Sequence, residues 1–301
     1  MSLQGLLRGH WPSLVGGGLH FTISCMIWVL IGGLSISISE DFGLTATQKG
    51  VLVAVPLLGG AFLRLLIGPL VDNYGAKTVG LYVLALEIVA LAYGWLWGSS
   101  YFIMLGVGML LGIAGASFAV AVPIASQAYP PEHQGLAMGV VAMGNSGVLL
   151  ATLLAPRLSK IVGWQDTFGL MIIPVFLTGI IFYHTVKRQP FLVEQSYPRS
   201  MSLRLLKDIL RQKFMYWLCF LYGVTFGGFV GLSSFLPVFF HDQYQIDMIT
   251  AGTMTALGGL AGSVARPVGG HLADRFGGSS LLIGLFLAIT LISLGLGQLY
   301  P

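Results

Sequence analysis

The sequence predicts an all-α membrane protein built from two repeated halves. Three observations predict this fold class: the composition, a series of long apolar runs, and an internal repeat. Of 301 residues, 55% are hydrophobic and only 9% are charged, whereas a soluble domain usually has about 25% charged residues. So few charges cannot cover a surface that faces water on all sides, and we therefore expect a lipid bilayer as the main solvent. The net charge of +4 does not indicate nucleic-acid binding, because the basic residues gather in one loop.

The apolar runs predict about nine membrane spans, since each span needs about 20 mainly apolar residues. The expected spans cover residues 14–38, 46–70, 77–98, 101–123, 135–156, 165–186, 214–240, 249–271 and 279–299. A polar, basic stretch separates the sixth span from the seventh. We therefore expect a six-helix bundle over 1–186, a cytoplasmic linker over 187–213, and the first three helices of a second bundle over 214–301.

Basic residues indicate the orientation, because cytoplasmic loops of membrane proteins carry an excess of Lys and Arg. If the N-terminus and the linker are cytoplasmic, ten basic residues lie inside and only Lys49, Arg157 and Lys160 lie outside. We therefore expect a multi-pass protein of the cell inner (plasma) membrane, with the N-terminus and residues 187–213 in the cytoplasm.

An internal repeat relates the two halves. Residues 45–77 match residues 247–279 without a gap, at an offset of 202 residues. The matched pairs include Gly60 and Gly262, Arg64 and Arg266, Gly68 and Gly270, Asp72 and Asp274, and Gly75 and Gly277. Such repeats are typical of transporters that bind their substrate between the halves. A complete second half would end near residue 388, so we expect the chain to be a truncated form that lacks about three helices.

Two arginines lie inside apolar runs at matching places of the repeat, Arg64 and Arg266. A charge at the bilayer centre costs at least ~2.5–3.5 kcal/mol on insertion scales, so it normally faces a cavity or a partner. The spans that hold them contain no acid at that depth, and a bound anion would relieve the repulsion between the two cations. Guanidinium offers a planar donor fork that matches planar oxyanions. The alternative is that each arginine snorkels toward the membrane surface or pairs with Glu87, Asp72 or a helix carbonyl.

The loops after the second and eighth spans share the pattern G-x-L-x-D-x-x-G. This pattern resembles the loop motif of the major facilitator superfamily, which implies a twelve-helix fold with two pseudo-symmetric halves, of which about nine helices are present. The resemblance also implies that these loops form a conformational latch. Its residues are Gly68, Asp72, Gly75, Gly270, Asp274, Arg275 and Gly277.

Within that superfamily, several segments resemble the nitrate/nitrite porter family. They are Gly59–Arg64, Gly262–Gly270, the Gly-Asn-Ser-Gly run 144–147, Gly112–Phe118, and the run that begins at Tyr222. The resemblance implies secondary transport of nitrate and/or nitrite by alternating access, as an antiporter or a symporter, in nitrate assimilation. It further implies that Arg64 and Arg266 clamp the anion, that Asn145 and Tyr222 donate hydrogen bonds to it, and that Phe118 and Phe226 sandwich its plane.

Glu87 and His20 also lie within apolar runs. Either is a possible proton site, although we favour a hydrogen-bonded structural acid for Glu87; exchange and proton symport both remain open. The sequence shows no metal-ligand spacing, cofactor motif or nucleophile–base set, so we expect no metal, no cofactor and no enzyme activity. The remaining alternatives are a carrier of another small anion, an anion channel, and a truncated membrane protein that does not transport.

Overall fold

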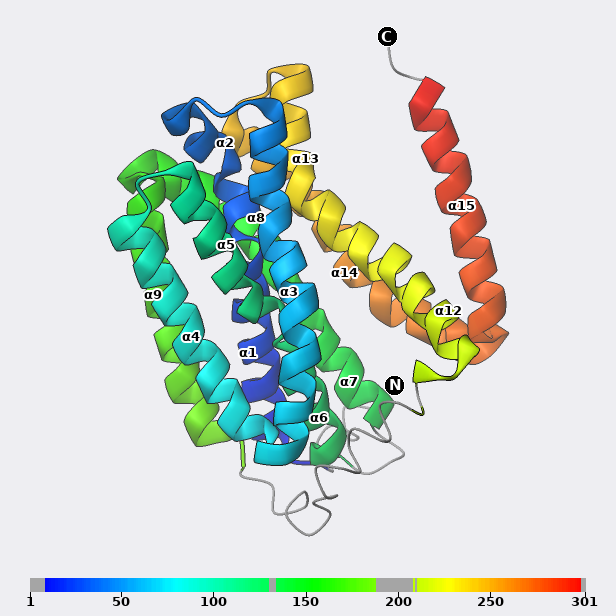
Figure 1. Ribbon diagram of the computed structural model, residues 1–301. Helices are drawn as coiled ribbons and strands as arrows, with labels where there is room; N and C mark the ends of the chain where they lie inside the picture. Colours follow the sequence, from blue (N-terminus) through cyan, green and yellow to red (C-terminus); the bar gives the residue numbers. More distant parts are fainter. Residues whose placement is uncertain (1–8, 130–133, 188–207, 209, 299–301) are drawn as a thin grey trace. The chain divides into compact units, whose positions relative to one another are not determined.

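The structure, a computed structural model, describes residues 9–129, 134–187, 208 and 210–298, and its regular elements in these ranges are helices (Figure 1). The elements are α1 (Trp11–Trp28), α2 (Leu30–Phe42), α3 (Ala46–Tyr74), α4 (Ala76–Trp97), α5 (Tyr101–Gly115), α6 (Phe118–Ala128), α7 (Gln134–Ala142), η3 (Met143–Ser146), α8 (Gly147–Val162), α9 (Trp164–Thr185), α12 (Lys213–Tyr222), η4 (Gly223–Gly227), α13 (Gly228–Tyr244), α14 (Met248–Phe276) and α15 (Gly278–Gln298). The chain divides into two compact units, Met1–Leu260 and Ala261–Pro301, and the site lies in the first.

Each predicted span falls on one helix or on consecutive helices, which confirms the fold class. Within the described residues, eight stretches are long and apolar enough to cross a membrane. The eighth predicted span coincides with α14, which begins and ends within a few residues of the predicted limits.

Local sequence explains where these helices begin and end. The Thr45 hydroxyl accepts from Gln48 N at 3.3 Å while the Gln48 side chain accepts from Thr45 N at 2.9 Å, so a capping box starts α3. Gly75 and Gly277, which are equivalent in the repeat, both have φ of 83°, a conformation that glycine adopts at little cost. At the start of α14, hydrogen bonds from Thr250 and Ile249 lower the pKa of Asp247.

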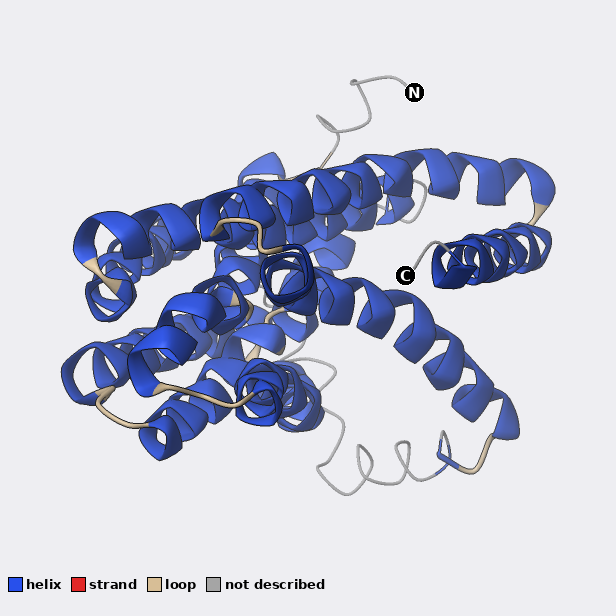
Figure 2. Cartoon of the chain, turned by 90° about the horizontal axis from the view of Figure 1, so that it is seen from above, coloured by secondary structure: helices blue, strands red, loops and turns tan. Residues whose placement is uncertain are grey.

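The core of the first unit is built around α1 and α2. Of the most apolar stretch in Trp11–Phe42, 83% is buried, compared with 33% in α3 and in α9. Helix α1 packs against α5, α6, α8 and α9, and the view from above shows the described regular structure as helices alone (Figure 2). The peripheral helices expose large apolar side chains such as Phe102 and Leu65, as expected where lipid is the solvent.

The seventh predicted span divides into α12, η4 and α13, whose environments differ. Helix α13 packs against α2, α3 and α8 and buries Val230, Ser233, Ser234 and Pro237, whereas α12 contributes no buried residue. We call the end of this unit that holds the α2–α3 and α8–α9 connections the Gly43 end, and the end that holds the α3–α4 connection the Gly75 end. The seventh span is therefore attached to the first six mainly toward the Gly43 end.

Candidate functional site

Regular α-helix is interrupted in four spans of the first unit. The breaks lie between α1 and α2 at Val29, between α5 and α6 at Ala116–Ser117, at the 3₁₀ turn Met143–Ser146, and at the π-helical turn Gly223–Gly227. Such turns are frequent at functional sites because they redirect side chains and free backbone groups. The predicted site residues Phe118, Asn145, Tyr222 and Phe226 lie in these breaks or directly beside them.

The break between α5 and α6 supplies a hydrogen-bond partner for Arg64. In a continuous α-helix the Gly115 carbonyl would accept from the amide four residues later, but Ala119 N donates to Ala116 O at 3.0 Å instead. Arg64 Nη2 donates to Gly115 O at 2.6 Å. One of the two interpretations of Arg64, a bond to a helix carbonyl, is therefore present in the structure, and it uses only part of the guanidinium group.

Three aromatic rings surround the Arg64 guanidinium. Its central carbon lies 5.9 Å from the ring centroid of Trp28, 6.0 Å from that of Phe118 and 5.6 Å from that of Phe226. These distances are within cation–π range. Among the described residues, no carboxylate forms an ion pair with Arg64, and Arg64 Nε is buried without a hydrogen-bond partner. The described side chains thus leave the positive charge of Arg64 uncompensated in an aromatic environment.

Arg64 lines a cavity between the second and seventh spans. The cavity has a volume of about 230 Å³ and is lined by Trp28, Leu57, Ala61, Arg64, Tyr222, Gly223, Phe226, Gly227 and Val230. The π-helical turn brings Tyr222 and Phe226 together, with ring centroids 5.1 Å apart and planes inclined by 14°. Cavities of this kind are mostly apolar with a few polar groups that orient a ligand, and here Arg64 supplies the charge.

Trp28 is a cavity residue that the sequence analysis missed. Its ring lies 6.4 Å from that of Phe226, inclined by 21°, and its Nε1 donates to Pro56 O at 2.8 Å. Glycine is needed on both sides of the indole, because a Cβ on Gly60 would lie 2.7 Å from Nε1 and a Cβ on Gly115 would lie 2.6 Å from it. Trp28 is therefore held firmly in place against Arg64. An indole in an apolar run gives no sequence signal of this position.

Asn145 is not among the residues that line the cavity. It is 3% exposed, its Nδ2 donates to Ala142 O at 3.1 Å, and its Oδ1 accepts from Cys25 Sγ at 3.8 Å. Asn145 thus joins the fifth span to α1, and its contact with an anion stays a prediction.

Glu87 and His20 are fully buried and do not line the cavity. Ser24 Oγ donates to Glu87 Oε1 at 2.6 Å, and His20 Nε2 lies 3.1 Å from Gly80 O. The hydrogen bond from Ser24 is the kind of contact expected if Glu87 is a structural acid. That role, and the possible proton roles of Glu87 and His20, stay predictions.

The predicted latch and the second arginine are only partly within the described residues. Asp72 is exposed, and Gly68 and Gly75 have open space where a Cβ would lie. The side chains of Arg266, Asp274 and Arg275 and the surroundings of Gly270 lie outside the described part of α14. The clamp formed by two arginines and the closing of the latch therefore stay predictions.

Residues 17–300 match the Major Facilitator Superfamily. The chain is 33% identical over 272 residues to the probable nitrate/nitrite transporter NarK2 of Mycobacterium tuberculosis, an alignment that covers 89% of this chain and 68% of the relative. It is 32% identical over 300 residues to the probable nitrate/nitrite antiporter NarK1 of Thermus thermophilus, covering 95% and 66%. The chain thus spans about two thirds of the length of these relatives.

Solved structures share the fold. A bacterial homologue of the human lysosomal transporter Spinster, in an inward-facing and occupied conformation, matches with a TM-score of 0.67 and 19% identity, over 87% of this chain and 61% of that chain. A D-xylose–proton symporter matches with a TM-score of 0.63 and 16% identity, over 88% and 69%. The chain therefore belongs to the Major Facilitator Superfamily, within the group of nitrate/nitrite transporters, and is a multi-pass membrane protein.

Proposed function

We propose that this protein is a secondary transporter that moves nitrate and/or nitrite by alternating access, with Arg64 holding the anion. One observation carries the proposal. The guanidinium group of Arg64 lines a cavity, lies among three aromatic rings, and has no ion-pair partner among the described residues. A cation left without a counter-charge in a low-dielectric environment attracts an anion strongly.

The chemistry of the cavity favours a small planar anion. Guanidinium has five N–H donors in a fixed fork, of which the bond to Gly115 O uses one. The remaining donors can bind two oxygens of one planar anion side by side. The parallel faces of Tyr222 and Phe226 suit a flat ligand better than a tetrahedral one. The names of the relatives NarK2 and NarK1 add support for nitrate and nitrite in particular.

The rest of the site follows from the repeat. We propose that Arg266, the equivalent of Arg64, supplies the second cation, and that Asn145 approaches the anion in another step of the cycle. The loops at Asp72 and Asp274 would latch the cytoplasmic side, with the N-terminus and residues 187–213 in the cytoplasm.

Because an empty site with two cations should resist reorientation, we propose obligatory exchange of nitrate for nitrite. The burial of Glu87 and His20 away from the cavity supports this coupling over proton symport.

Counterflow of labelled nitrate in proteoliposomes tests the function. Vesicles that contain the wild-type protein should take up nitrate when nitrite is inside. Arg64→Lys and Arg266→Lys should each reduce this uptake at least ~100-fold, because lysine keeps the charge but lacks the planar donor fork of guanidinium. The matched control is Arg211→Lys, since Arg211 is exposed just before α12; it should behave like wild type. Normal uptake by Arg64→Lys would show that this arginine is structural, and saturable uptake of chlorate or a carboxylate in preference to nitrate would assign another anion.

A further inference from the structure

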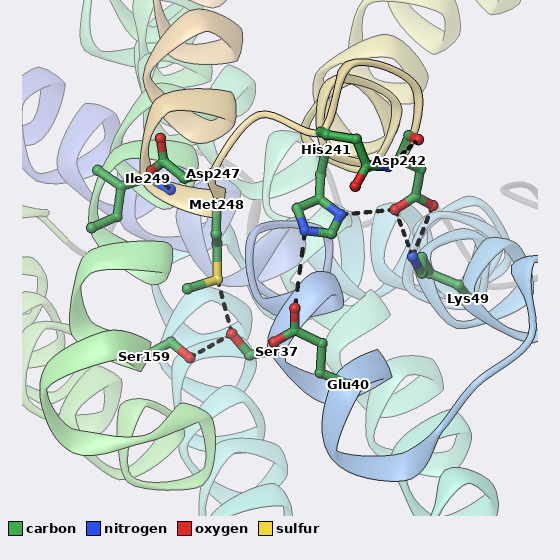
Figure 3. Close-up of polar contacts among 10 residues, drawn as sticks. Ser37, Glu40, Lys49, Ser159, His241, Asp242, Asp247, Met248 and Ile249 are labelled. Atoms are coloured by element: carbon green, nitrogen blue, oxygen red, sulfur yellow. Dashed lines mark hydrogen bonds and ion pairs between the residues drawn. The ribbon is translucent and has the colours of Figure 1, made fainter.

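Charged side chains join the seventh span to the first six at the Gly43 end (Figure 3). Lys49, at the start of α3, places Nζ 2.9 Å from Oδ1 and 2.8 Å from Oδ2 of Asp242, near the end of α13. The Lys49 side chain is 12% exposed and that of Asp242 is 41% exposed. The pair is therefore partly exposed, chiefly through Asp242.

A histidine extends this ion pair to a third helix. His241 Nδ1 lies 2.9 Å from Asp242 Oδ1, and its Nε2 lies 3.9 Å from Glu40 Oε1 in α2. Figure 3 shows His241 between the two carboxylates, with Lys49 on the far side of Asp242. We call Glu40, Lys49, His241 and Asp242 the charged cluster; it joins α2, α3 and α13.

Close packing continues next to the charged cluster. The Ser37 hydroxyl donates to Met248 Sδ at 2.9 Å and accepts from Ser159 at 2.8 Å, and Arg157 Nη2 donates to Thr253 Oγ1 at 3.0 Å. Further along α13, the backbone and Cβ of Ser234 approach Gly32 so closely that a Cβ there would lie 3.1 Å from Ser234 O. The first six spans and the segment 228–260 are thus in direct contact at this end.

The Gly75 end of the seventh span is different. Helix α12 buries no residue, and its Phe214, Trp217 and Phe220 are 60% exposed or more. The cavity at Arg64 lies between these two regions, because its lining residues run from Tyr222 to Val230. Contact is therefore tight on one side of the cavity and loose on the other.

We propose that the charged cluster is a reversible lock that holds the Gly43 end closed and must open for the anion to enter from that side. This inference rests on the proposed alternating access. The exposure of Asp242 suits such a function, because a partly solvated ion pair contributes modestly to stability, whereas breaking a fully buried pair would leave an unpaired charge in a low-dielectric environment. Water can solvate Asp242 each time the lock opens, so the lock biases the equilibrium between states without trapping one of them.

Cysteine labelling at Ser234 tests the lock without any substrate. Ser234 is 2% exposed, lies beyond the charged cluster on α13, and its hydroxyl has no hydrogen-bond partner among the residues that the structure describes. Ser234→Cys is introduced with Cys25→Ala and Cys219→Ser, so that it is the sole thiol of the chain. A membrane-impermeant maleimide is added to right-side-out vesicles, and in parallel to inside-out vesicles.

With the lock intact, labelling from the outside should be slow. Asp242→Asn should accelerate it about 1.5- to 5-fold, the shift expected when one solvent-accessible ion pair is lost, and Lys49→Glu should accelerate it more because two acids then repel. The charge swap Lys49→Asp with Asp242→Lys should return the rate toward that of wild type. The matched control is Asp166→Asn, because Asp166 lies at the same end but accepts from Trp95 within the first six spans; its rate should not change.

Unchanged labelling in Asp242→Asn and Lys49→Glu, or a charge swap as fast as the single variants, would overturn the proposal. Acceleration in inside-out vesicles alone would also overturn it, since the lock would then face the cytoplasm. The assay contains no nitrate, so it tests the lock separately from the substrate. If the protein shows this labelling pattern but fails to transport nitrate, the proposed substrate is wrong and the proposed lock stands.

Discussion

Two regions of the seventh span, the one beside the cavity and the one at the Gly43 end, use different chemistry for their contacts with the rest of the first unit. Beside the cavity, the Phe226 ring lies against Trp28 and Arg64, and the Tyr222 ring stacks on Phe226. Toward the Gly43 end, Asp242 and its neighbours form ion pairs. Aromatic faces around one cation select a ligand by shape and charge, whereas exposed ion pairs change the equilibrium between conformations. The comparison indicates that anion selectivity and the opening of the protein can be changed separately by mutation.

The largest effect is expected at the cavity, from Trp28→Ala. Removing a buried tryptophan side chain typically costs about 3–5 kcal/mol, and the Arg64 guanidinium would lose one of its aromatic neighbours. Nitrate exchange should fall more than ~10-fold, and thermal unfolding in detergent should occur at a lower temperature. Trp28→Phe, which keeps an aromatic face, should recover part of both. Equal exchange in wild type and Trp28→Ala would mean that the cavity region does not have the separate role in anion binding that this comparison gives it.

A smaller effect, also at the cavity, is expected from Gly115→Ala. The new methyl group would overlap the Trp28 indole, and overpacking of this kind typically costs about 1–3 kcal/mol. Gly106→Ala on the same helix is the matched control, because open space surrounds that position. Exchange and melting temperature should both fall in Gly115→Ala and stay unchanged in Gly106→Ala; equal behaviour of the two variants would mean that Trp28 moves freely.

At the Gly43 end, Asp242→Asn should change rates and leave selectivity alone. We expect the rate of exchange to change about 1.5- to 5-fold, in line with the modest contribution of such a pair. The ratio of inhibition by nitrite to inhibition by chloride should equal that of wild type, because the cavity is untouched. A changed ratio would mean that the Gly43 end and the cavity are not independent.

The smallest effect is expected from Glu87→Gln. The amide oxygen of glutamine can still accept the hydrogen bond from Ser24, and the residue does not line the cavity. Exchange measured at several external pH values should stay within about twofold of wild type, a change below ~0.5 kcal/mol. Abolished exchange, or loss of a pH dependence that wild type shows, would instead make Glu87 a proton site.

The sequence was sufficient for the positions of the helices because each span is a long apolar run, and the capping box at Thr45 and the turn at Gly75 depend on residues that are adjacent in the chain. It also singled out Arg64, since a charge in an apolar run is visible without a structure, whereas Phe226 was expected only from the resemblance to the nitrate/nitrite porter family. It could not identify Trp28, whose position depends on glycines in two other helices. Nor could it identify the partner of Arg64, because the Gly115 carbonyl becomes available only where α5 ends. The sequence analysis also missed the charged cluster, because Lys49 and Asp242 are 193 residues apart and only the fold brings them together.

The central claim is that Arg64 holds the anion, and equilibrium binding of nitrate to the purified protein tests it most directly. Titration calorimetry on wild type, Arg64→Lys and Arg211→Lys in the same detergent requires neither vesicles nor a working transport cycle. The account predicts saturable binding of nitrate to wild type and to Arg211→Lys, and at least ~100-fold weaker binding to Arg64→Lys, a difference of about 2.7 kcal/mol. Nitrate binding of equal affinity in wild type and Arg64→Lys would contradict the account.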